Sequence, residues 1–150
     1  MKKIMLVGKV GCGKTTLTQA INGVPRESRK TQAIEFHDSV VDTPGEYIEK
    51  RFFYNALLQH GAACDLIAFV QDCRDTISTF PPGFAVLLKK PVIGIITKID
   101  VSPNHQGFVR ESLESLGIKE IYEVSAKEGI GMEALMTFLK GKEDEMLEER

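Results

Sequence analysis

A lysine and a threonine close a glycine-rich stretch near the start of the chain, and this pairing suits a nucleoside triphosphate. The stretch fits the pattern Gly-x-x-x-x-Gly-Lys-Ser/Thr and reads Gly8-Lys9-Val10-Gly11-Cys12-Gly13-Lys14-Thr15. In such a loop the backbone N–H groups surround the phosphates; Lys14 would reach the β- and γ-phosphates, and the Thr15 hydroxyl would bind Mg²⁺. Thr16 follows at the start of a helix and would help to position the phosphates. The alternative is a chance match in a tight strand–helix turn.

A second candidate for metal chemistry is the segment Asp42-Thr43-Pro44-Gly45, which follows two valines. An aspartate in this place can hold Mg²⁺ through a water molecule, and the Gly45 N–H can meet a γ-phosphate. By itself the segment is simply a good turn. Its position at the end of an apolar stretch favours the metal-binding interpretation.

Two further segments could recognise a base. In Thr97-Lys98-Ile99-Asp100 the aspartate could accept hydrogen bonds from guanine N1–H and N2–H₂, donors that adenine does not offer as a pair. The aliphatic stem of Lys98 would pack along the base plane. A backbone N–H within Ser125-Ala126-Lys127 could meet guanine O6, although a helix cap explains that segment equally well. The sequence therefore predicts GTP or GDP as the ligand and leaves ATP open.

These segments need a scaffold that brings them to one place. Short apolar runs predict strands, and the stretches between them predict helices. The predicted strands are residues 2–7, 32–36, 39–42, 65–71, 91–97 and 120–124; the predicted helices are 14–22, 46–60, 84–88, 102–116 and 130–140. Apolar strands alternating with helices indicate a mostly parallel sheet covered on both faces, with a very small hairpin at 32–42. Ligands in such folds bind at the carboxyl ends of the strands, where all the motifs above fall.

Size and composition restrict the possible functions. The 150 residues predict a single domain, 1–150, and a net charge of −2 gives no general attraction to nucleic acid or to an anionic membrane. Three cysteines without Cys-x-x-Cys spacing predict reduced thiols rather than disulfides or zinc. Cys12 lies near a helix N-terminus, where its pKa could be lowered. We expect a cytoplasmic protein without a membrane anchor of its own.

The order of the four motifs resembles the Ras-like GTPases of the translation-factor class over nearly the whole chain. The resemblance implies a three-layer P-loop fold that binds guanine nucleotide with Mg²⁺. It also implies a switch threonine before Asp42, for which Thr31 is the only well-placed candidate. The expected metal ligands are then Thr15, Thr31 and Asp42, and the expected catalytic groups are Lys14, Thr31 and Gly45.

A closer resemblance is to the EutP/PduV family of ethanolamine- and propanediol-utilisation operons. It rests on residues 30–36 (Lys-Thr-Gln-Ala-Ile-Glu-Phe), on residues 41–47 (Val-Asp-Thr-Pro-Gly-Glu-Tyr) and on the compact length. The resemblance implies association with bacterial microcompartments, whose shell or enzyme proteins would be partners. An acetate kinase activity has been assigned on the ethanolamine side of this family.

Departures from the Ras-like pattern bear on catalysis. Glu46 stands where those proteins place the glutamine that orients the attacking water, and we expect slow hydrolysis; an acidic residue in a helix first turn is the simpler interpretation. Thr97 replaces the usual asparagine, which predicts a weaker tether to the phosphate loop and lower affinity. Arg26 or Arg29 could act as an internal arginine finger. Three functions remain open: a GTP-binding protein with slow hydrolysis, a phosphotransferase that makes acetyl phosphate, and a non-enzymatic adaptor.

Overall fold

A six-stranded sheet forms the centre of the computed structural model, which describes residues 1–23, 33–102 and 106–148, with side chains described as far as residue 141. The strand order is β2-β3-β1-β4-β5-β6, and every neighbouring pair is parallel except β2 with β3. The strands are β1 Ile4–Val7, β2 Glu35–His37, β3 Val40–Asp42, β4 Leu66–Asp72, β5 Val92–Thr97 and β6 Ile121–Glu123. The predicted mostly parallel sheet with a shortened hairpin is confirmed.

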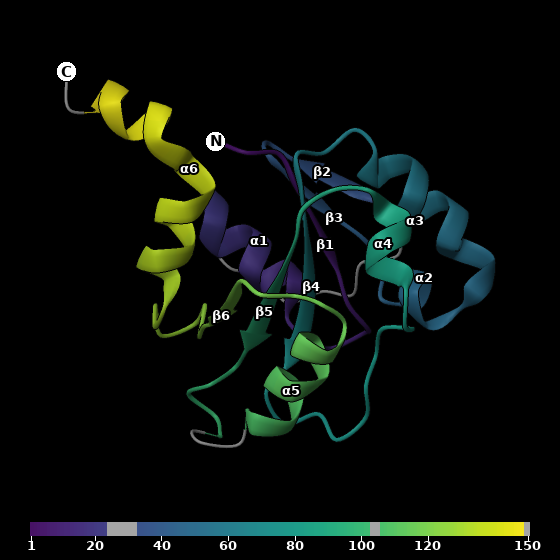
Figure 1. The fold of residues 1–150 in the computed structure, drawn as a ribbon. Helices are drawn as coiled ribbons and strands as arrows, with labels where there is room; N and C mark the ends of the chain where they lie inside the picture. Colours follow the sequence, from purple (N-terminus) through teal and green to yellow (C-terminus); the bar gives the residue numbers. More distant parts are fainter. Residues whose placement is uncertain (24–32, 103–105, 149–150) are drawn as a thin grey trace.

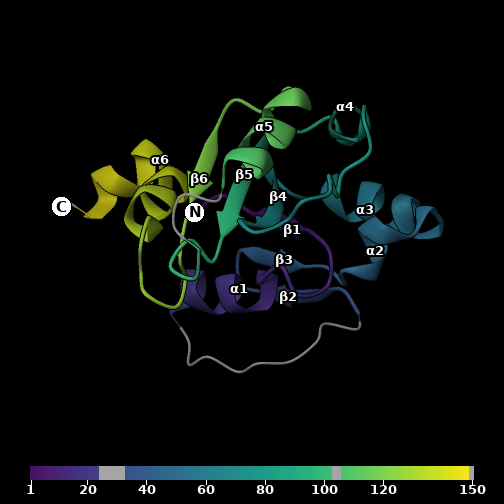
Figure 2. The same ribbon diagram turned by 90° about the horizontal axis from the view of Figure 1, so that it is seen from below.

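Helices cover both faces of this sheet, as Figures 1 and 2 show. Along β1 the side chains alternate between the two cores: Ile4 and Leu6 pack with α1 and α6, whereas Met5 and Val7 pack with the opposite helices. The first layer consists of α1 Lys14–Asn22 and α6 Met132–Glu148; the second consists of α2 Glu46–Glu49, the 3₁₀ turn η1 Arg51–Phe53, α3 Tyr54–Gly61, α4 Phe84–Leu88 and α5 Gly107–Ser115. The three-layer α/β architecture follows.

The predicted helix 46–60 is wrong as a single element. Lys50 has extended dihedral angles (φ −118°, ψ 119°), so α2 ends there and η1 begins. The break allows the rings of Tyr47 and Phe53 to stack with centroids 4.4 Å apart. This stacking is a tertiary contact that favours the break, and a local helical pattern does not reveal it.

The predicted start of a helix at residue 102 is also wrong, because α5 begins at Gly107. The Val101 N–H donates to the Lys98 carbonyl at 3.0 Å and closes a turn directly after β5. Lys98 itself has φ +61°. Residues 98–101 therefore stay at the carboxyl edge of the sheet, where they contribute to a pocket.

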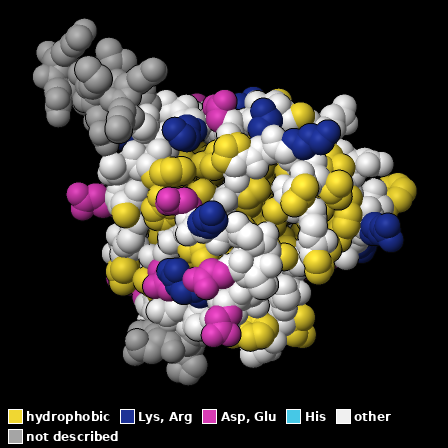
Figure 3. All heavy atoms as spheres, in the orientation of Figure 1, with side chains coloured by type: hydrophobic (Ala, Val, Ile, Leu, Met, Phe, Trp, Pro, Cys, Tyr) yellow, Lys and Arg dark blue, Asp and Glu magenta, His cyan; other side chains and the backbone are white. Residues whose placement is uncertain are grey.

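The helices of the second layer leave apolar side chains on the surface. Phe52 of η1 is 87% exposed and Val86 of α4 is 77% exposed. In Figure 3 hydrophobic side chains gather over the side of the molecule formed by α3 and α4. In the part of the chain that the structure describes, no helix is both long and apolar enough to cross a membrane.

Candidate nucleotide-binding site

The phosphate-loop motif connects β1 to α1. Gly13 precedes the helix with φ +98°, a conformation that side-chain-bearing residues rarely adopt, and no side chain of the described residues caps the helix there. The N–H groups of the first turn of α1 therefore point toward the loop, as anion binding requires. Lys14 is buried, and its ammonium donates to the carbonyls of Gly8 (2.6 Å) and Lys9 (3.2 Å). The ammonium charge of Lys14 is thus fixed beside the backbone of the phosphate loop.

Thr15 and Asp42 meet where the motifs predicted a metal site. The Thr15 hydroxyl donates to Asp42 Oδ2 at 2.9 Å, and Asp42 is fully buried at the end of β3. The hydroxyl of Thr43 donates to the Leu6 carbonyl at 2.7 Å and fixes the chain after β3 against β1. A hydroxyl and a carboxylate are oxygen ligands that fit Mg²⁺ completed by phosphate oxygens and water. Thr31, Arg26 and Arg29 lie outside the described residues.

The base-recognition segments surround a pocket of about 290 Å³ beside the start of α1. Two bonds attach its floor to the phosphate loop: the Thr97 hydroxyl donates to the Cys12 carbonyl and the Lys98 ammonium to the Gly11 carbonyl, each at 2.6 Å. Although Thr97 lacks the amide of the usual asparagine, its hydroxyl still ties the end of β5 to the phosphate loop. The pocket is lined by Gly13, Thr16, Arg74, Thr97, Lys98, Asp100, Val101, Ser125, Ala126 and Lys127.

Ser125 has a structural role within this pocket wall. Its hydroxyl accepts the N–H of Glu128 at 3.1 Å, and its own N–H donates to the Ile130 carbonyl at 2.9 Å. Ser125 therefore builds the turn that follows β6; it does not cap a helix, because α6 begins only at Met132. The same turn carries Ala126 and Lys127, which also line the pocket.

Sequence reasoning missed an acidic residue that braces the pocket. At the end of β4, Asp72 receives the Arg74 N–H (2.9 Å) and two bonds from its guanidinium (3.0 and 2.8 Å), and it lies 3.4 Å from the Lys98 ammonium. Burial raises the pKa of Asp72, but these bonds and charges outweigh it and lower the pKa to about 2. The side chain stays ionised and holds Lys98, which lines the pocket. The available signal was the position of Asp72 at the end of a predicted strand, because Lys98 follows the end of another predicted strand.

Cys12 corrects another expectation. Its thiol is buried and receives the Lys14 ammonium at 3.6 Å. Burial raises the pKa of Cys12, and the nearby positive charge of Lys14 only partly offsets this effect. The predicted lowering of the pKa by the helix N-terminus is therefore wrong. The thiol packs as a small apolar side chain beneath the loop.

The start of α2 approaches the phosphate loop. A Cβ added to Gly45 would lie 2.1 Å from the Val10 nitrogen, so only glycine allows the observed backbone contact. Glu46 lies in the first turn of α2 and forms an (i, i+4) ion pair with Lys50 at 4.0 Å. This geometry agrees with the simpler interpretation of Glu46 as a first-turn acidic residue.

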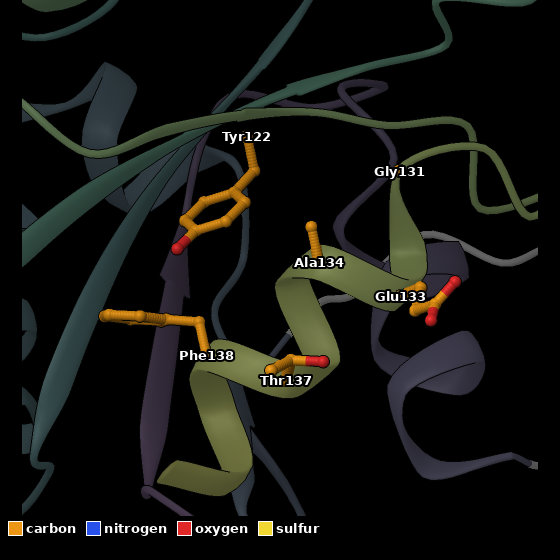
Figure 4. A pocket seen from close by; sticks show the side chains of 6 residues that line it. All are labelled: Tyr122, Gly131, Glu133, Ala134, Thr137 and Phe138. Carbon is orange, nitrogen blue, oxygen red and sulfur yellow. The ribbon is translucent and has the colours of Figure 1, made fainter. Parts of the chain in front are cut away.

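A second hollow lies away from these motifs, between β6 and α6. It is a wide, shallow depression open to solvent, and none of the predicted site residues lines it. Figure 4 shows the rings of Tyr122 and Phe138 close together, with Glu133 directed away from them. The smaller pocket adjoins the phosphate loop and carries Asp100, so it is the better candidate for the nucleotide site.

Fold and site together define a P-loop nucleotide-binding protein of the GTPase type. The solved structure of Era in complex with MgGDPNP and nucleotides 1506–1542 of 16S ribosomal RNA is similar, with a TM-score of 0.68 and 23% sequence identity. The match covers 93% of this chain and 56% of Era. At this identity the likeness establishes the fold.

Sequence comparison gives the family. Residues 1–141 match the family described as "PduV-EutP: Ethanolamine utilisation - propanediol utilisation". The propanediol utilization protein PduV of Citrobacter freundii is 41% identical over 148 residues, covering 98% of this chain and 99% of PduV. The "Probable acetate kinase EutP" of Escherichia coli K12 is 34% identical over 142 residues, covering 93% of this chain and 89% of EutP. The chain belongs to the PduV-EutP family.

Proposed function

We propose that this protein binds GTP with Mg²⁺ and hydrolyses it slowly, as part of ethanolamine or propanediol utilisation. The observation that carries the proposal is a pocket presenting Asp100, joined by two short hydrogen bonds to a phosphate loop. Guanine offers two donors to a carboxylate, whereas adenine at the same place would leave it unpaired, which favours GTP and GDP over ATP.

In the proposed complex, Lys14 and the N–H groups of α1 hold the phosphates, and Thr15 with Asp42 holds Mg²⁺. Mg²⁺ would neutralise charge that develops on the phosphate oxygens. In the described part of the chain no group of three or more His, Cys, Asp or Glu gathers to bind a metal alone, so the ion would bind together with the nucleotide. Slow hydrolysis follows from Glu46, whose position in α2 supplies no amide to orient water.

The second candidate is transfer of the γ-phosphoryl group to acetate, favoured by two relatives that carry the name "Probable acetate kinase EutP". Lys14 and the Thr15–Asp42 pair would serve either acceptor, because phosphoryl transfer depends mainly on positioning and charge stabilisation. The third function, that of an adaptor, would keep the bound nucleotide without turnover. Microcompartment proteins are proposed partners on the strength of family membership, in a cytoplasmic setting.

One experiment separates the three. The purified protein is incubated with Mg²⁺ and GTP or ATP, with and without acetate, while free phosphate and acetyl phosphate are measured, beside the Lys14→Ala variant. Slow phosphate release that needs GTP and Lys14 supports the proposal. Acetyl phosphate formed in proportion to acetate would replace hydrolysis by the kinase function, and binding with no turnover above the variant would leave the adaptor.

A further inference from the structure

The phosphate loop is in contact with the segment that is proposed to sense the γ-phosphate. Gly45 packs so closely that an added Cβ would lie 2.1 Å from the Val10 nitrogen and 2.6 Å from the Lys9 carbonyl carbon. Val10 is the third residue of the loop, on the side away from the base pocket. The space between Val10 and Gly45, which a γ-phosphate would enter, is therefore narrowed by backbone in this conformation.

A carboxylate reinforces this contact. Glu49, one helical turn after Gly45, accepts a hydrogen bond from the Val10 N–H at 3.3 Å. An N–H of the phosphate loop is thus satisfied by an anion of the protein itself. Glu49 is exposed to solvent, so no buried charge needs to be compensated.

The lysines next to Glu49 and Val10 in the sequence form ion pairs with other carboxylates. Lys50 pairs with Glu46 at 4.0 Å, and Lys9 pairs with Asp75 at 3.2 Å. No ion pair to Glu49 is found among the residues that the structure describes. Within the described ranges, its negative charge therefore acts on the loop without a paired cation to offset it.

We propose that Glu49 is a specificity-determining residue that disfavours the third phosphate of the nucleotide. The proposal rests on the proposed binding of guanine nucleotides. A diphosphate can occupy the loop and the first turn of α1 while Glu49 keeps its bond to Val10. A γ-phosphate must either bind beside the carboxylate or displace it, together with α2, from the loop.

Both alternatives weaken the binding of the triphosphate in particular. If Glu49 stays, a γ-phosphate carrying two negative charges about 6 Å away changes binding about tenfold even at the dielectric constant of water. If Glu49 leaves, its hydrogen bond to Val10 is lost and α2 must move. The β-phosphate of GDP lies farther from Glu49 and is more strongly screened, so the affinity for GDP is affected much less in both cases.

The test compares nucleotide affinities of Glu49→Gln and Glu49→Ala with those of wild type. Calorimetric titration with GDP and with a non-hydrolysable GTP analogue, in Mg²⁺, gives the ratio of the two dissociation constants. Glutamine removes the charge and keeps an acceptor for the Val10 N–H, whereas alanine removes both. Glu111→Gln, at an exposed position of α5, is the matched control.

We expect both variants to improve binding of the analogue about tenfold relative to GDP, with the affinity for GDP within about twofold of wild type. The control should leave the ratio unchanged. A ratio unaffected by both Glu49 variants, or equal changes in both affinities, would overturn the inference while leaving nucleotide binding intact. Wild-type protein that binds neither nucleotide would instead overturn the proposed function, and the inference with it.

Discussion

Asp72→Asn is the substitution that most directly probes the bracing of the base pocket. Asp72 is 7% exposed, and its two oxygens receive three hydrogen bonds from Arg74 besides the nearby Lys98 ammonium. Asparagine has the same shape but no charge, and its NH₂ group must face a donor of Arg74. The variant should therefore lose both the electrostatic attraction and at least one hydrogen bond.

The magnitude follows from the pKa of Asp72, which burial raises but the Arg74 bonds and the Lys98 charge lower to about 2, from a usual 3.8. Such a shift corresponds to about 2 kcal/mol of stability. Because the side chain of Arg74 is 49% exposed, solvent screening reduces this to about 1 kcal/mol. The folded-state pKa lies below the unfolded-state value, so the contribution is complete above about pH 4 and is lost as the pH falls toward about 2.

The assay is urea unfolding of wild type and Asp72→Asn, followed by circular dichroism at pH 7 and at steps between about pH 4 and pH 2. We expect the variant to be about 1 kcal/mol less stable at pH 7, with the difference shrinking across the acid steps. Asp38→Asn, at a hairpin position with φ +53° that asparagine tolerates, is the control. Equal stability at pH 7, or a difference that does not depend on pH, would refute the reasoning.

Three further substitutions test the contacts of the loop. Gly45→Ala forces the backbone away from Val10 and should lower stability by about 1–3 kcal/mol, so an unchanged thermal midpoint would contradict the close contact. Thr97→Val removes the bond to the Cys12 carbonyl and should cost about 1 kcal/mol in urea unfolding and weaken GDP binding; unchanged values for both would exclude the tether. Thr15→Ala should abolish the difference in GTP affinity between Mg²⁺ and EDTA buffers, and a retained difference would place the metal elsewhere.

Much of the scaffold was predictable because buried strands carry a strong signal. The apolar run 65–71 became β4 Leu66–Asp72, and 91–97 became β5 Val92–Thr97. Once the strands are parallel, their carboxyl ends share one edge, so the meeting of the Thr97 and phosphate-loop segments follows from topology. The motifs fixed residue types at that edge, which is why Asp100 and Lys127 were found to line one pocket.

Contacts between surface charges and loop backbone were not predictable in the same way. Glu49 meets Val10 because the backbone at Gly45, where α2 begins, packs against the phosphate loop, a contact between segments distant in sequence. Arg74 follows β4 in a segment without a recognised motif, and its bonds to Asp72 depend on a local turn. Such features arise from tertiary packing, which overrides local propensity.

A carboxylate acts at each end of the site, and this bears on how turnover is interpreted. At the base, Asp72 holds Lys98 in place; at the third phosphate, Glu49 adds a negative charge. If both act as proposed, GDP binds more tightly than GTP, and release of GDP rather than phosphoryl transfer can limit the steady state. A slow steady-state rate would then not identify Glu46 as the cause. A single-turnover measurement separates the two, because slow chemistry slows the first turnover, whereas slow release leaves it fast.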